Sequence, residues 1–191
     1  PTVATLGEGI DLALANKESL VVGGELVMAL AEATGAQIIP VDSEHSALRQ
    51  LIEGEGPGAV ERRLITASGG PFRGQTREQL AHVTIEQALK HPTWEMGGKI
   101  TIDSATLINK GLELTEPHHM FGIPARKLGV LVHPQSIVHG LVSFADGAVV
   151  AGLACPDMKV PIAHCLGYPA RVPTSARRLD LAAIASLSFE K

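Results

Sequence analysis

The sequence predicts an α+β fold, with a mixed, partly antiparallel sheet flanked by helices. Three strand-like runs, at residues 130–133, 138–145 and 148–154, follow one another with little room for helix between them. The last two runs meet at Asp146-Gly147, a dipeptide that favours a tight hairpin turn and therefore antiparallel pairing. Earlier in the chain, strand-like runs and helical patterns alternate, which makes the expected sheet mixed.

Helix and strand patterns alternate through the first half of the chain. The second helix should end at Gly35, because glycine is the commonest residue just past a helix C-terminus. The glycine-rich stretch 54–58 predicts a linker. In order, the expected elements are a helix and a strand within 1–16, a helix over 18–34, a strand over 37–41, a helix over 44–52 and a strand over 63–67.

Two more helices are expected in the second half. The first is a long helix from residue 99 to about 119, and the other covers 158–166 and ends at Gly167. The apolar residues whose spacing supports the long helix are Ile100, Leu107, Ile108, Leu112 and Leu114.

Two acidic residues, Asp42 and Glu44, directly follow the predicted strand at 37–41. The carboxyl end of a strand is where open α/β sheets present ligand groups, and two carboxylates there can share one hard cation. Oxygen ligands suit Mg²⁺ or Mn²⁺ better than Zn²⁺. An alternative is that Asp42 or Ser43 caps the following helix and that Glu44 complements its dipole.

Glu113 is the candidate third metal ligand. On the predicted long helix, Asn109 lies four residues and Lys110 three residues before Glu113, so one face offers an amide, an ammonium and a carboxylate. Taken alone, the spacing of Lys110 and Glu113 favours an ordinary surface ion pair, which is what most such spacings are.

A glycine-rich turn, Ser68-Gly69-Gly70, follows the predicted strand at 63–67. Its backbone amides and the Ser68 hydroxyl could approach a phosphate closely, although the same stretch also fits an ordinary flexible loop. Downstream, the only tryptophan of the chain, Trp94, and Met96 lie beside a glycine pair. This arrangement indicates a movable lid that excludes water, with a half-buried packing role for Trp94 as the alternative.

The composition is that of a globular protein rather than a nucleic-acid or membrane protein. The chain has 191 residues, 45% hydrophobic and 19% charged, with a net charge of -4. Nucleic-acid surfaces need clustered Lys and Arg, and no apolar run reaches the roughly 18 residues of a membrane span. Cys155 and Cys165 lack zinc or redox spacing and are expected to be reduced packing residues. A cytoplasmic location is expected, or a plastid one in a plant or alga.

Seven motifs, collinear over nearly the whole chain, resemble the 1-deoxy-D-xylulose 5-phosphate reductoisomerase family. They lie at residues 14–20, 40–47, 66–73, 91–97, 102–113, 133–139 and 155–159. The resemblance implies an NADP-dependent oxidoreductase and isomerase of non-mevalonate isoprenoid biosynthesis, the methylerythritol phosphate pathway. Its substrate would be 1-deoxy-D-xylulose 5-phosphate and its product 2-C-methyl-D-erythritol 4-phosphate. It also implies NADPH, a divalent metal (Mn²⁺, Mg²⁺ or Co²⁺) and a homodimer.

The resemblance also assigns roles to individual residues of this chain. The metal ligands would be Asp42, Glu44 and Glu113, and the catalytic residues Lys17, Glu44 and Glu113. The substrate would be bound by Lys17, Ser43, Glu44, Ser68, His91, Ser104, Asn109, Lys110 and Glu113, with its phosphate chiefly at Ser68, His91, Ser104, Asn109 and Lys110. Trp94 and Met96 would form the lid, and NADPH would contact Asn16, Glu18, Gly97 and Met158.

The chain departs from that family in lacking a G-x-G-x-x-G turn after an N-terminal strand. We therefore expect residues 1–34 to be the tail of a Rossmann-type, NADPH-binding domain with a connecting helix. Residues 35–170 would be the catalytic domain, and 171–191 the start of a linker to a C-terminal domain. The isolated chain should be inactive in reduction. Two alternatives are a non-catalytic metal-binding or assembly module and another sugar-phosphate isomerase or aldose reductase.

Overall fold

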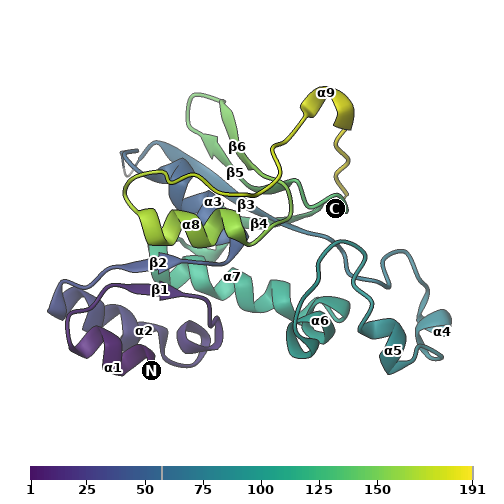
Figure 1. Ribbon diagram of the computed structural model, residues 1–191, viewed down its shortest axis with the longest axis horizontal. Helices are drawn as coiled ribbons and strands as arrows, with labels where there is room; N and C mark the ends of the chain where they lie inside the picture. Colours follow the sequence, from purple (N-terminus) through teal and green to yellow (C-terminus); the bar gives the residue numbers. More distant parts are fainter. Residues whose placement is uncertain (57, 191) are drawn as a thin grey trace.

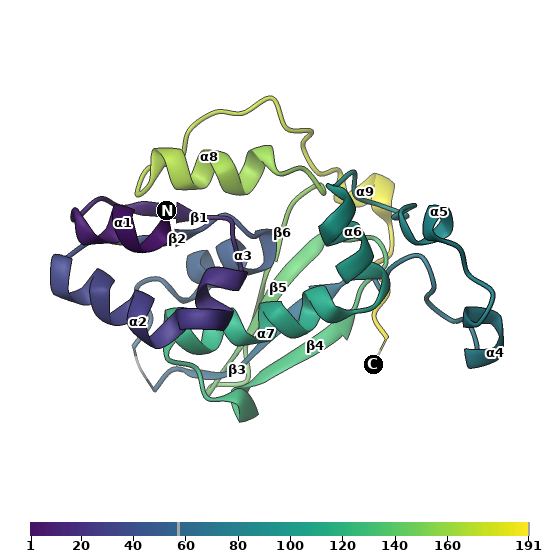
Figure 2. The same ribbon diagram turned by 90° about the horizontal axis from the view of Figure 1, so that it is seen from below.

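Two sheets organise the chain, one small and parallel, the other larger and mixed. The computed structural model describes residues 1–56 and 58–190, so Pro57 of the predicted linker and Lys191 of the predicted C-terminal segment lie outside the described residues. The small sheet lies at one end of the molecule with the first two helices, and two short helices lie at the opposite end (Figures 1 and 2).

The small sheet joins two strands that flank a long helix. It is formed by β1 (Leu12–Leu14) and β2 (Ile38–Pro40), which pair in parallel, and is accompanied by α1 (Thr2–Gly7) and α2 (Glu18–Thr34). Leu6, Leu20 and Val27 form a buried core beneath it. As predicted, α2 ends at Gly35, whose φ of 73° lies in the left-handed region that glycine adopts without strain.

The larger sheet confirms the predicted α+β class. Its strand order is β4 (Leu128–Val132), β3 (Val60–Ala67), β5 (Val138–Phe144) and β6 (Val149–Leu153). The β3–β4 pair is parallel, whereas β3–β5 and β5–β6 are antiparallel. The β5–β6 hairpin turns at Asp146-Gly147 as predicted, with Gly147 at a φ of 90°.

Helix α3 (Ser43–Ile52) packs on this sheet and carries the first site residues at its N-terminus. Its Leu48 is fully buried in a core with Ile65 and Val142. Small residues allow this close approach, because a Cβ added at Gly152 of β6 would lie 2.9 Å from Ala47 Cβ. Helix α8 (Lys159–Gly167) packs against α3 and against β2.

The prediction of a single helix over residues 99–119 is wrong. The chain forms α6 (Gly98–Ala105) and α7 (Ile108–Phe121), separated by Leu107 at a left-handed φ of 61°. Thr106 is the C-cap of α6, and both its backbone N–H, at 3.1 Å, and its hydroxyl, at 3.2 Å, donate to the carbonyl of Ile102. Helix α2 is likewise interrupted, with non-helical backbone at Gly23.

The remaining short elements were not predicted. They are α4 (Arg77–Leu80), α5 (Ile85–Ala88), the 3-10 helix η1 (Ala125–Lys127) and α9 (Leu181–Ile184). After α9 the chain returns to the large sheet, where Glu190 bridges to Val132 of β4. Among the described residues, no helix is both long and apolar enough to cross a membrane.

Candidate metal and anion site

Asp42 stands between β2 and α3 and serves two purposes. Its Oδ1 accepts the backbone N–H of Glu44 at 3.2 Å, so Asp42 is the N-cap of α3, as the capping interpretation predicted. The same carboxylate lies at the edge of a cavity of about 280 Å³. Capping therefore fixes the carboxylate in place without removing it from the candidate site.

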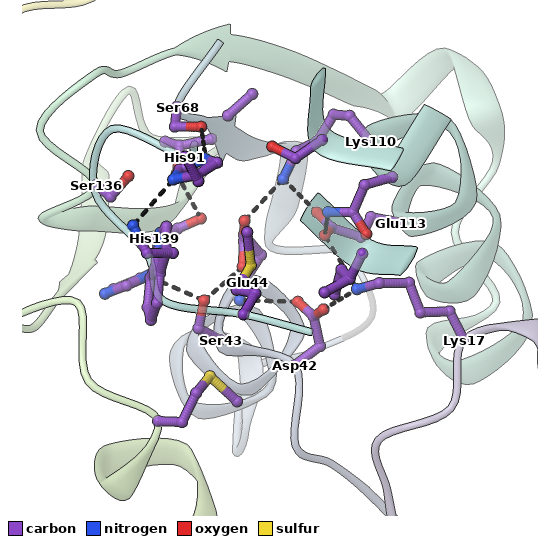
Figure 3. Close-up of a pocket in the computed structure, with 18 of the residues that line it drawn as sticks. Lys17, Asp42, Ser43, Glu44, Ser68, His91, Lys110, Glu113, Ser136 and His139 are labelled. Carbon is purple, nitrogen blue, oxygen red and sulfur yellow. Dashed lines mark hydrogen bonds and ion pairs between the residues drawn. The ribbon is translucent and has the colours of Figure 1, made fainter. Parts of the chain in front are cut away.

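Asp42, Glu44 and Glu113 converge on this cavity. Each offers a carboxylate oxygen, and the three oxygens lie within 4.8 Å of one another. Glu113 reaches the cluster from α7, across from the N-terminus of α3 (Figure 3). An oxygen-only donor set of this size fits Mg²⁺ or Mn²⁺. The structure thus brings together the three residues predicted as metal ligands.

Two lysines pair with the three carboxylates. Lys17 Nζ donates to Glu113 Oε1 at 3.0 Å and to Asp42, while Lys110 Nζ donates to Glu44 Oε1 at 2.7 Å and to Glu113. Lys110 and Glu113 are only 8% and 2% exposed, so the interpretation of this pair as a surface ion pair is wrong. Both lysines belong to a buried network.

The charges of this network control its protonation. Burial opposes ionisation of Asp42, but Lys17, His45 and Lys110 together outweigh it and hold the pKa of Asp42 well below its usual range. Burial and the carboxylates of Asp42 and Glu44 raise the pKa of Glu113. Burial lowers the pKa of Lys17, yet Asp42 and Glu113 raise it by more, so Lys17 stays charged.

A second polar group faces the same cavity at Ser68 and His91. The His91 Nδ1 accepts the backbone N–H groups of Thr93 at 3.1 Å and Trp94 at 2.9 Å, so the ring proton lies on Nε2, 2.8 Å from Ser68 Oγ. Burial also lowers the pKa of His91, which favours this neutral form. Ser104 and Asn109 line the cavity as well.

Glycine is required where this loop meets α6. Gly70 has a φ of 68°, and a Cβ added there would lie 2.7 Å from the Ser104 carbonyl oxygen. Its backbone N–H donates to Ser68 Oγ at 3.2 Å. Ser68 and Gly69 of the glycine-rich turn line the cavity, as the phosphate-binding interpretation requires.

The residues predicted as lid and cofactor contacts divide into two groups. Trp94, Met96 and Met158 line the cavity, and the half-buried Trp94 ring meets His139 edge-on at 6.1 Å. Asn16, Glu18 and Gly97 do not line it. Each is next in sequence to a lining residue, Asn16 and Glu18 to Lys17 and Gly97 to Met96. Asn16 donates to Glu18 at 2.9 Å, and Glu18 pairs with Lys99.

Sequence reasoning missed two buried residues behind the carboxylates, His45 and Glu116. His45 Nε2 lies 2.8 Å from the Glu113 carbonyl oxygen, and its Nδ1 lies 3.3 Å from Asp42 Oδ1 and 3.5 Å from Glu116 Oε2. Burial lowers the pKa of His45, but Asp42, Glu116 and Glu113 together raise it to about 9 overall. Burial raises the pKa of Glu116 to about 7. Spacing could have found them, since His45 follows Asp42 and Glu116 follows Glu113 by one helical turn.

Asp42, His45 and Glu116 form a second group whose ligand atoms lie within 4.8 Å of one another. Neither His45 nor Glu116 lines the cavity, so the three-carboxylate set is the one open to a ligand. His139 was also missed. It is 6% exposed, and its Nδ1 lies 3.1 Å from Ser43 Oγ, which in turn donates to Glu44.

Comparison with known proteins places this chain in a family. A model described as the 1-deoxy-D-xylulose 5-phosphate reductoisomerase C-terminal domain matches residues 38–121, and another, the DXP reductoisomerase C-terminal domain, matches 153–191. The enzyme of that name from Chlorobium chlorochromatii is 56% identical over the whole chain. The chain belongs to the 1-deoxy-D-xylulose 5-phosphate reductoisomerase family. The Clostridium perfringens reductoisomerase is 55% identical over the same 191 residues. The chain spans 50% of the length of each of these relatives.

Solved reductoisomerases share the fold. One described as a complex with NADPH, fosmidomycin and magnesium superposes with a TM-score of 0.94 at 43% identity, covering 100% of this chain and 49% of that one. The Zymomonas mobilis reductoisomerase in complex with NADPH has a TM-score of 0.90 at 46% identity, covering 99% of this chain and 48% of that one. The resemblance predicted from the seven motifs is confirmed.

Proposed function

We propose that the protein carrying this chain converts 1-deoxy-D-xylulose 5-phosphate to 2-C-methyl-D-erythritol 4-phosphate, by a metal-assisted rearrangement followed by NADPH reduction. The observation that carries the proposal is that one cavity joins an oxygen-only carboxylate cluster to a hydroxyl and imidazole group at Ser68 and His91. Relatives over 50% identical bear the enzyme's name, and a related solved structure contains NADPH, fosmidomycin and magnesium.

Asp42, Glu44 and Glu113 would hold Mg²⁺, Mn²⁺ or Co²⁺. The cation would supply Lewis acidity to the adjacent ketone and hydroxyl oxygens of the substrate. The carboxylates are held in position by their neighbours, Asp42 through the helix cap and Glu44 through the hydroxyl of Ser43. Lys17, beside them, would approach the reacting carbons.

Ser68 is suited to bind the phosphate end. Its oxygen lies next to two donors, His91 Nε2–H at 2.8 Å and the Gly70 N–H at 3.2 Å, so its own hydrogen is free to donate to a phosphate oxygen. Ser104, Asn109 and Lys110 would complete the phosphate contacts. Holding the phosphate remote from the reacting carbons would orient the reactive end.

NADPH would lie near Met158, Gly97, Asn16 and Glu18, with Trp94 and Met96 closing over the substrate to exclude water. Three of these residues already line the cavity, namely Trp94, Met96 and Met158.

We infer further that the protein is a cytoplasmic homodimer. Exposed apolar side chains on β6 support the dimer, since Val149 and Val150 are 58% and 44% exposed. The two cysteines are free thiols, which supports the cytoplasmic location.

We also propose that the chain divides into three segments, residues 1–34, 35–170 and 171–191. The buried core around β1 and α2 supports a separate first segment, although it includes Ala36 and Ile38 beyond residue 34.

Titration of Mn²⁺ into this chain by calorimetry, with and without a phosphonate-hydroxamate of the fosmidomycin type, tests the site. We expect binding that tightens with the mimic and is lost in Glu113→Gln, whereas Glu78→Gln on exposed α4 should bind like the wild type. Binding that survives in Glu113→Gln would contradict the three-carboxylate assignment.

The alternatives can be separated in the complete protein. Glu44→Gln should abolish both metal affinity and rearrangement, whereas a non-catalytic module would show only a lower melting temperature. Preference for ribulose 5-phosphate over 1-deoxy-D-xylulose 5-phosphate would instead indicate another sugar-phosphate isomerase.

A further inference from the structure

Lys110 faces two kinds of partner in one cavity. The residues proposed for the phosphate, Ser68, His91, Ser104 and Asn109, line the same cavity as Lys110. Its ammonium, however, is directed at the opposite group, since Nζ donates to Glu44 at 2.7 Å and to Glu113 (Figure 3). At least two of its three N–H donors are therefore committed to carboxylates and are not available to an anion.

The charge balance explains this arrangement. Asp42, Glu44 and Glu113 carry up to three negative charges in a buried site, and Lys17 and Lys110 supply two positive charges. A divalent cation carries the same charge as the two ammonium groups together. It would occupy the same carboxylate oxygens, so the cation and the two lysines compete for them.

We propose that Lys110 is an exchangeable counter-ion that couples cation binding to anion binding. Without a cation it neutralises Glu44 and Glu113, and with a cation bound it turns to an anion at the Ser68–His91 end of the cavity. The reason is that a buried ammonium without a partner is unstable, so a Lys110 displaced from its carboxylates needs another anion. The proposal rests on the metal site proposed above and adds the order in which that site is filled.

Lys17 provides an internal comparison. Its ammonium contacts Asp42 and Glu113 and, in Figure 3, approaches from the side away from Ser68 and His91. Both lysines should therefore weaken cation binding by competition, but only Lys110 should link the cation to the anion. Such linkage is reciprocal, so the anion should tighten cation binding by the same factor.

Calorimetric titration of this chain with methylphosphonate, in EDTA and in saturating Mg²⁺, measures the coupling. Methylphosphonate has the anionic end of the substrate but no ketone or hydroxyl to chelate the metal. We expect about tenfold tighter methylphosphonate binding in Mg²⁺ for the wild type. This tightening of methylphosphonate binding by Mg²⁺ should persist in Lys17→Met and vanish in Lys110→Met. In a separate titration without methylphosphonate, both variants should bind Mg²⁺ about tenfold more tightly than the wild type, because one competing ammonium is gone.

Lys99→Met is the matched control. Lys99 also bridges two carboxylates, Glu18 and Asp103, but its side chain is 68% exposed and lies outside the cavity. The Lys99→Met substitution removes one positive charge and should change neither the methylphosphonate affinity nor the Mg²⁺ affinity. Lys110→Arg, which keeps the charge, should retain the coupling, and circular dichroism identifies any variant that fails to fold.

Four results would overturn the proposal. One is equal methylphosphonate affinity in EDTA and Mg²⁺ for the wild type. Another is a Mg²⁺ effect that persists in Lys110→Met, which would mean that the anion contacts the metal directly. The third is a failure of the wild type to bind Mg²⁺ at all, which would refute the metal site itself. Mg²⁺ binding that is lost in Glu113→Gln but unaffected by Lys110→Met would refute only the exchange and leave the metal site standing.

Discussion

At the scale of single residues, the local hydrogen bonds of His91 decide its chemical role. Protonation of its Nδ1 would eject the two backbone N–H groups of Thr93 and Trp94. Burial already lowers the pKa of His91 below the ordinary 6.5. Because the folded pKa is depressed, the neutral ring stabilises the fold above the unfolded pKa, and that stabilisation is lost as the pH falls through the folded pKa.

We therefore predict that the segment containing Trp94 loosens as the pH falls below 6.5. Trp94 is the only tryptophan, so its fluorescence reports the change directly. The transition should be absent in His91→Gln. His139 also meets the indole, edge-on, and burial lowers its pKa too. A transition that persists in His91→Gln and disappears in His139→Gln would assign it to His139 instead.

At the scale of elements, the contact between α2 and α7 places Glu113 and Glu116. Gly24 makes this contact possible, because a Cβ added there would lie 2.4 Å from the His119 imidazole. An alanine in place of glycine within a helix ordinarily stabilises it by up to about 1 kcal/mol. At Gly24 the close approach of His119 should make the same substitution destabilising instead.

We predict that Gly24→Ala lowers the free energy of unfolding by about 1 to 3 kcal/mol, because one helix must shift to relieve the overlap. Urea denaturation measures the change. His119→Ala removes the clashing ring and should restore stability in the double variant, while Gly7→Ala, with nothing within 4 Å, is the control. A Gly24→Ala protein as stable as the wild type would show that the helices can move apart freely.

At the scale of the whole molecule, the carboxylate cluster joins parts that are distant in the sequence. Asp42 and Glu44 belong to the start of α3, which packs on the large sheet, whereas Glu113 belongs to α7, which packs against α2. A ligand that binds all three therefore links the N-terminus of α3 to α7. Binding to the native state alone also raises stability by mass action.

We predict that Mg²⁺ at about 100 times its dissociation constant raises the melting temperature by about 5 to 10 °C for a chain of this size. Differential scanning calorimetry in Mg²⁺ and in EDTA measures the shift. Glu113→Gln should abolish it, and Glu78→Gln on the exposed surface should keep it. An equal shift in Glu113→Gln would mean that the stabilising cation binds elsewhere.

The sequence by itself determined the strands, the helices α1, α2, α3 and α8, the hairpin at Asp146-Gly147 and the three carboxylates of the candidate site. These follow from short-range patterns, namely apolar spacing, turn residues and acids placed just after a strand. The same kind of pattern was misleading over 99–119, because helical spacing continues through Leu107 while the backbone does not.

Only the tertiary structure decided what surrounds those carboxylates. Lys17 and Glu113 are 96 residues apart, and Lys110 and Glu44 are 66 apart, yet both pairs are joined by hydrogen bonds. Local spacing cannot reveal such pairs, because they form only when α3, α7 and the residues before α2 pack around one cavity. Burial at that junction, rather than the identity of any residue, turns Lys110 from a surface cation into a counter-ion of the site.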